Sequence, residues 1–196
     1  MQETSASLLM LAGREGNADA WRRLEAIYSP ILRNWLHVHG VKAADADDLA
    51  QDVLLTVLRE LPKFDHSGRP GAFRSWLRTT LVHRVRDFWR SRRREPPAVG
   101  GTSWSQRCEQ LSDESSALSR EWNLAHDQQV MAQLLKQVRP RFEVKTWDAF
   151  WRQVYNGQRA DDVAAELGMS LSSVYVARSR VLKTLRKEAG GLVDDL

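Results

Sequence analysis

The stretch of sequence that decides the fold lies near the C-terminus and reads ADDVAAELGMSLSSVYVARS, residues 160–179. It contains two segments in which apolar residues recur at helical spacing, and Gly168 separates them. Glycine accepts the positive φ that ends a helix, and Ser170 is suited to cap the helix that follows. Ala164 is small enough for two steeply crossing helices to pack closely. The spacing therefore predicts a helix-turn-helix.

The second of these helices has a face that points away from its expected buried side. Because successive residues turn by about 100°, this face begins with short polar side chains and continues with cations. Such polar groups suit base edges in a major groove, whereas cations suit phosphates. The residues expected to contact DNA here are Ser172, Ser173, Tyr175, Val176, Ser179, Arg180 and Lys183. The alternative is an ordinary helical hairpin whose lysines and arginines are merely solvated.

The rest of the 196-residue chain also favours helices, because no segment alternates apolar and polar residues as a strand does. We expect an all-α protein of two small helical domains, a bundle over residues 1–95 and a helix-turn-helix domain over 121–196. The stretch 96–120 is rich in Pro, Gly, Ser and acids, and is expected to be a flexible linker. The expected helices cover residues 7–15, 18–39, 45–61, 73–94, 121–138, 142–155, 160–167 and 171–188.

The formal charge of +4 is unevenly distributed along the chain. Residues 73–94 carry a net charge of +7 and residues 141–187 a net charge of +4, whereas the segments around them are negative. Two separated basic segments therefore stand out, and both fall on expected helices.

The first basic segment predicts a long helix with one apolar side and one exposed side. Its apolar stripe consists of Phe73, Leu77, Leu81, Val85 and Phe88. Cations and an aromatic ring on the opposite side suit a nucleic-acid strand whose bases are partly unstacked. The expected contacts are Arg78, His83, Arg86, Trp89 and Arg90. The alternative is an arginine-rich surface helix that aids solubility or pairs with the preceding acidic helix, with Trp89 in the core.

The helix expected over residues 45–61 is amphipathic and acidic at its start. Acids near the N-terminus complement the helix dipole, and this effect alone accounts for Asp45 and Asp47. The exposed residues Asp48, Gln51, Asp52 and Leu55 instead form the kind of patch that docks a protein. Partner binding and a purely structural role both remain open on the residues alone.

Several classes of protein are excluded by what the sequence lacks. The chain has no apolar run long enough to span a membrane and no signal peptide, so we expect a cytoplasmic protein without a membrane partner. A single cysteine, Cys108, rules out a disulfide or a cysteine-based zinc site within one chain. No phosphate loop, nucleophile motif or set of metal-binding residues is present, so neither catalysis nor a cofactor is expected.

Three motifs together resemble the extracytoplasmic-function group of the sigma-70 family of RNA polymerase sigma factors. They are DDLAQDV over residues 47–53, AFRSWL over residues 72–77 and the C-terminal helix-turn-helix. The resemblance covers roughly residues 5–95 and 121–188. It implies two all-helical domains, core RNA polymerase and promoter DNA as partners, an anti-sigma protein as a further candidate partner, and no catalytic role.

The resemblance also implies roles for particular segments. Asp48, Gln51 and Asp52 match the positions that bind the clamp helices of the largest polymerase subunit. Residues 64–94 would recognise and help melt the minus-ten element, and residues 170–186 would read the minus-thirty-five element. The linker would lie near the active-site cleft of the polymerase.

The chain departs from the family pattern at two places. Asp52 stands where the family usually has Glu, and YVAR at 175–178 replaces a more polar run in the recognition helix. Together with KTWDAF at 145–150, this helix resembles a branch found in bacteria of the planctomycete kind. Two other hypotheses remain: a stand-alone helix-turn-helix regulator, and a sigma-like protein that binds polymerase without reading promoters.

Overall fold

A computed structural model describes residues 7–14, 17–64, 69, 71–92 and 102–193. Within these residues the chain forms nine α-helices and two short 3-10 turns, and no β-strand. The prediction of an all-α protein is therefore confirmed. Residues 96–101 of the expected linker lie outside the described residues, as do residues 65–68, 70, 93 and 94 of the segment expected to melt DNA.

The first half of the chain folds into four helices whose bounds lie close to the predicted ones. Asn17 caps the second of them through its side-chain oxygen, which accepts the Ala20 N–H at 3.1 Å. Gly40, at φ 89°, makes the turn into the next helix. The helices are α1 (Leu8–Ala12), α2 (Ala18–Val38), α3 (Ala43–Glu60) with the 3-10 turn η1 (Leu61–Lys63), and α4 (Ala72–Arg92).

The segment expected to be a linker contains a further helix, α5 (Trp104–Ser112), and the start of α6 (Ala117–Val138). Ser103 and Gln106 form a capping box at the start of α5. Trp104 meets Trp35 of α2 at a ring-centroid distance of 6.0 Å, and Trp122 of α6 meets the same ring at 5.1 Å. The second half of this expected linker is therefore helical and packed, because widely spaced tryptophans anchor it to α2.

The helix-turn-helix is present as predicted. It is formed by α8 (Ala160–Leu167) and α9 (Leu171–Ala189), supported by α7 (Val144–Val154) after the 3-10 turn η2 (Arg139–Arg141). Gly168 ends α8 with φ 60°, and the Ser170 hydroxyl caps α9 by accepting the Ser173 N–H at 3.1 Å. A small core of its own, separate from the main one, consists of Ala149, Val163, Val174 and Ala177.

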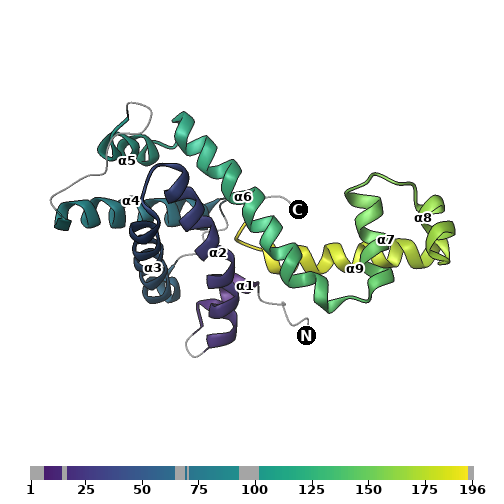
Figure 1. Ribbon diagram of the computed structural model, residues 1–196. Coiled ribbons are helices and arrows are strands. Elements are labelled where there is room, and N and C mark those ends of the chain that lie inside the picture. The colour runs from purple at the N-terminus through teal and green to yellow at the C-terminus, as the bar shows by residue number, and fades with distance from the viewer. Residues whose placement is uncertain (1–6, 15–16, 65–68, 70, 93–101, 194–196) are drawn as a thin grey trace.

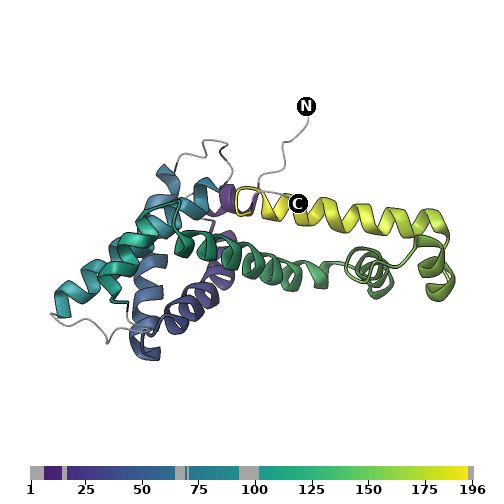
Figure 2. The ribbon, with the colours of Figure 1, turned by 90° about the horizontal axis from the view of Figure 1, so that it is seen from above.

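The helix-turn-helix stands at the end of an arm (Figure 2). The arm consists of α9 and the C-terminal half of α6, which run side by side away from α2–α5 and carry α7 and α8 at the far end. In both ribbon views, α8 and the start of α9 lie at one end of the molecule and the end of α4 lies at the other (Figures 1 and 2). The two predicted DNA-binding helices therefore extend in opposite directions.

A buried carboxylate fixes the base of this arm. Glu188, near the end of α9, accepts hydrogen bonds from Arg23 of α2 and Arg141 of η2, each at 2.6 Å. Burial alone would raise the pKa of Glu188, but hydrogen bonds and charge from the two arginines hold that pKa below its usual value. The ion pairs therefore link the arm to the N-terminal helices.

Trp122→Ala should lower the free energy of unfolding by about 3–5 kcal/mol, because the indole is fully buried and the change leaves a large cavity. Urea unfolding followed by circular dichroism measures the loss. Leu124→Ala is the control, since that side chain is 62% exposed on the same helix and its loss should cost less than about 0.5 kcal/mol. Equal losses for both variants would contradict this account of the core.

Glu188→Gln should destabilise the protein at neutral pH, because an amide cannot replace the carboxylate between two guanidinium groups. A carboxyl group whose pKa is lowered by folding stabilises the folded state above its unfolded pKa of about 4.3, and this contribution is lost as pH falls through the lowered pKa. The gap between wild type and variant should therefore shrink at acidic pH. Urea unfolding over a pH series tests this, and a gap independent of pH would refute it.

Candidate nucleic-acid and polymerase interfaces

All seven predicted DNA-contacting residues of α9 are exposed, on a surface that we call the recognition face. It comprises Ser172, Ser173, Tyr175, Val176, Ser179, Arg180 and Lys183. The hydroxyl groups at its start form a local network, in which Ser170 Oγ lies 3.0 Å from Ser172 Oγ and 2.7 Å from Ser173 Oγ. The hydroxyls are thus held at the N-terminal end of the helix, where they remain open to solvent.

A basic groove runs along the same helix. Its lining comprises Tyr175, Arg178, Ser179, Leu182, Lys183 and Arg186. Of the three cations in this set, Arg178 lies near the middle of α9 and Lys183 and Arg186 lie toward its C-terminal end, beyond the hydroxyl groups at its start. This arrangement suits bases at one end and phosphates along the side.

The basic helix α4 keeps only a narrow exposed strip. We call the residues Thr79, His83, Arg86 and Arg90 the basic strip, and all four are exposed. Arg90 pairs with Asp87 at 2.5 Å, and Arg86 lies 3.5 Å from the Ser112 hydroxyl of α5. Three of the five predicted contacts on this helix, His83, Arg86 and Arg90, are therefore accessible to a nucleic acid.

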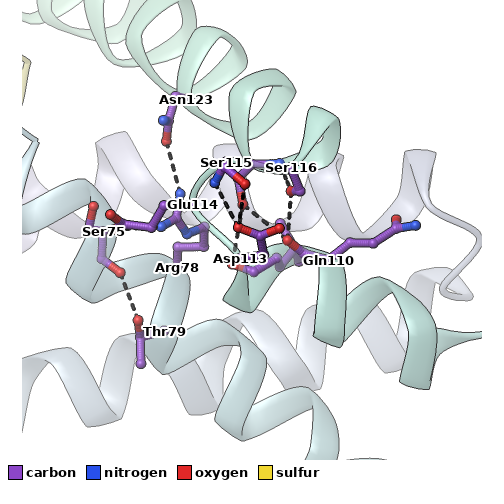
Figure 3. Close-up of polar contacts among 11 residues, drawn as sticks. Ser75, Arg78, Thr79, Gln110, Asp113, Glu114, Ser115, Ser116 and Asn123 are labelled. Atoms are coloured by element: carbon purple, nitrogen blue, oxygen red, sulfur yellow. Dashed lines mark hydrogen bonds and ion pairs between the residues drawn. The ribbon is translucent and has the colours of Figure 1, made fainter.

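The other two predicted contacts on α4, Arg78 and Trp89, are not exposed. Arg78 is 3% exposed, and its guanidinium group pairs with Glu114 at 3.0 Å and lies 3.4 Å from Asn123 Oδ1 (Figure 3). Trp89 is 7% exposed and packs edge-to-face on Phe88. The expected exposure was wrong because α4 is covered on two sides, by α3 and by α5, rather than on one.

A polar chain that sequence reasoning missed crosses three helices beside this covered side. Arg74 of α4 binds Asp127 at 2.5 Å, Asp127 lies 2.9 Å from His126 Nδ1, and His126 Nε2 lies 3.0 Å from the Tyr28 hydroxyl. Burial and the nearby Asp127 charge raise the pKa of Tyr28. For Asp127, burial would raise the pKa, but hydrogen bonds from His126 and Arg74 lower it. No spacing in the sequence indicates this network, since its members come from distant segments.

The acidic helix α3 presents the predicted docking residues to solvent. We call Asp48, Gln51, Asp52 and Leu55 the acidic patch, and all four are exposed. Leu49, Ala50 and Val53 point into the core and fix the orientation of the helix. Leu58, one helical turn beyond Leu55, is also exposed and extends the patch with apolar surface.

The described residues show no grouping of three or more His, Cys, Asp or Glu side chains able to hold a metal ion. Among the same residues, no helix combines the length and apolar content required to cross a membrane. The candidate sites are therefore the three surfaces on α3, α4 and α9.

Comparisons with known proteins give these surfaces a context. The family described as sigma-70 region 2 matches residues 24–95, which cover most of α2 and all of α3 and α4. The ECF RNA polymerase sigma factor ShbA of Streptomyces griseus is 29% identical over 180 residues, which cover 88% of each chain. The chain therefore contains sigma-70 region 2 and is similar to extracytoplasmic-function sigma factors over most of its length.

Other similar proteins match over smaller shares of their own length. SigD of Mycobacterium tuberculosis is 30% identical over 148 residues, which cover 73% of the present chain and 62% of SigD. BldN of Streptomyces coelicolor is 26% identical over 185 residues, which cover 93% of the present chain and 66% of BldN. The chain thus spans just under two thirds of these two relatives. The resemblance to a planctomycete branch remains a prediction.

Proposed function

We propose that the protein is a sigma factor, which binds core RNA polymerase and directs it to a particular set of promoters, where transcription begins. The observation that carries this conclusion is the match to region 2 over the helices that bear both the acidic patch and the basic strip. The helix-turn-helix at the far end of the arm supplies a second DNA-binding element. The polymerase performs the chemistry, and the sigma factor contributes binding and selection.

The acidic patch is the proposed polymerase contact. Asp48 and Asp52 offer two carboxylates one helical turn apart, and Leu55 adds an apolar group next to them. A basic helical surface with an apolar residue fits this combination, because opposite charges steer association while the apolar contact slows dissociation. The clamp helices of the largest polymerase subunit are the proposed partner, and an anti-sigma protein is proposed as a competitor for the same chain.

The two basic surfaces are the proposed promoter contacts. Residues 1–95 would bind polymerase and use the basic strip at the minus-ten element, where arginines follow the phosphates of an opening strand. Residues 121–196 would place the recognition face in the major groove of the minus-thirty-five element. The location of these surfaces at opposite ends of the molecule supports simultaneous binding of two separated elements.

In vitro transcription tests the proposal directly. Purified core polymerase is incubated with sheared genomic DNA, with and without the protein, and new RNA 5′ ends are mapped. A sigma factor yields ends that appear only with the protein and share two upstream elements. Polymerase binding without new ends would instead indicate a protein that occupies polymerase without reading promoters. DNA binding without polymerase, at a palindromic site, would indicate a stand-alone regulator.

Asp48→Arg should weaken binding to core polymerase by about tenfold or more, because it places a cation where a basic partner docks. Fluorescence anisotropy with labelled protein measures the affinity. Glu25→Arg makes the same charge change at an exposed position on α2 and serves as the matched control. An unchanged affinity for the Asp48 variant would show that the docking assignment is wrong.

Lys183→Ala should weaken promoter binding by the holoenzyme for all sequences alike, because its ammonium group is assigned to a phosphate. The slope of log affinity against log salt concentration should become shallower by about 0.9, the value for one phosphate contact on duplex DNA. Lys136→Ala, an exposed lysine on α6, provides the control. If the two variants have the same slope, Lys183 does not contact the backbone.

A further inference from the structure

The covered side of α4 holds arginines that face carboxylates instead of solvent. Arg78 binds Glu114, and Arg74 binds Asp127, so both cations are neutralised by the segment that follows the basic helix. We propose that residues 104–127 conceal a second row of nucleic-acid contacts on α4, with Glu114 and Asp127 occupying positions that phosphates take when the segment moves away. This inference rests on the proposed role of α4 in binding promoter DNA.

The contact between Arg78 and Glu114 is unequal in its exposure. The Arg78 side chain is 4% exposed, whereas the Glu114 side chain is 75% exposed. The guanidinium group is therefore enclosed by its surroundings, while the carboxylate covers it from the solvent side. An anion of similar geometry, such as a phosphate, would satisfy the same guanidinium group if Glu114 were displaced.

A structured turn holds Glu114 in this position (Figure 3). The Asp113 carboxylate accepts the Ser115 N–H at 2.9 Å and the Ser115 hydroxyl at 2.8 Å. The Ser116 hydroxyl donates to the Gln110 carbonyl at 2.6 Å, which ties the turn back to α5. Glu114 is thus presented to α4 by a turn between two helices rather than by a loose chain.

The concealed residues lie directly beside the basic strip. Arg74 and Arg78 are one helical turn apart, and Trp89 lies three turns further along the same side of α4. Thr79 and Arg86 border this side at the edge of the basic strip. Removal of the cover would therefore widen the strip by two arginines, which add charge for phosphates.

The cover is held down by apolar contacts as well as by charge. Trp104, Cys108 and Leu111 of α5 and Trp122 of α6 are all buried against the N-terminal helices. The segment 95–140 carries a net charge of −2 and follows a segment of +7, so charge complementarity favours the closed arrangement. In the free chain the cover should stay closed, and polymerase with promoter DNA must supply the free energy that opens it.

The single cysteine reports the opening without any change to the protein. Cys108 is 1% exposed and lies on the inner side of α5, so a maleimide should label it slowly in the free chain. Labelling should become at least several times faster in the complex of the full chain with core polymerase and a promoter fragment. Continued protection of Cys108 in an active promoter complex would overturn the proposal, because the cover would then be a permanent part of the fold.

Substitution of Glu114 tests the concealment itself. Glu114→Gln removes the charge that occupies Arg78, so the holoenzyme should bind a labelled single-stranded oligonucleotide several times more tightly, with a salt slope steeper by about 0.7. Glu109→Gln makes the same charge change at an exposed site on α5 and should leave binding unchanged. If both variants gained equally in oligonucleotide affinity, the gain would come from the change in net charge, and the concealment would be refuted.

Two further variants separate failure of the concealment from failure of the proposed function. In an Arg78→Met background, which keeps an apolar stem in the core, Glu114→Gln should bring no gain, and a persisting gain would refute the assignment to Arg78. Arg86→Ala should weaken oligonucleotide binding whether or not the cover exists. If Arg86→Ala weakens binding while Glu114→Gln has no effect, the concealment fails and the role of α4 stands; if neither has an effect, the role of α4 fails as well.

Discussion

The packing of three tryptophans is the interaction on which the arrangement of this protein depends. Trp35 of α2 packs edge-to-face against Trp104 of α5 and Trp122 of α6. The helices before and after the expected linker therefore meet in one core. Without these contacts α5 would not be a stable helix, since a helix of nine residues is only marginally stable in isolation. The position of α6, and with it the direction of the arm, follows from the same core.

Several arginines of this chain pair with carboxylates on the segments that pack against them. The arginines of α4 that face α5 and α6 meet Glu114 and Asp127, and the arginines at the base of the arm meet Glu188. The cations left on α4 and α9 form the two surfaces assigned to DNA. Intramolecular pairing thus selects which of the basic residues are available to a nucleic acid.

Local signals made much of the fold predictable from sequence. The turn at Gly168 and the helix cap at Ser170 depend only on residues close by in the sequence. The helix-turn-helix could therefore be predicted together with its turn and its cap. The acidic patch was equally accessible to prediction, because one buried face determines the opposite one. Arg78 and Trp89 were placed wrongly because a helix covered from two directions has two buried faces, and the second cover came from a Ser- and acid-rich segment with few apolar residues.

The ion pairs of Glu188 also fix the point about which a rigid arm would rotate. Glu188 lies near one end of α9, and Ser172, the first residue of the recognition face, lies near the other, about 24 Å away at about 1.5 Å per residue. A rotation of about 10° at Glu188 would shift Ser172 by about 4 Å, which exceeds the spacing of about 3.4 Å between neighbouring base pairs. A small change in the contacts of Glu188 with Arg23 and Arg141 would therefore move the proposed DNA-contacting end of α9 by about one base pair.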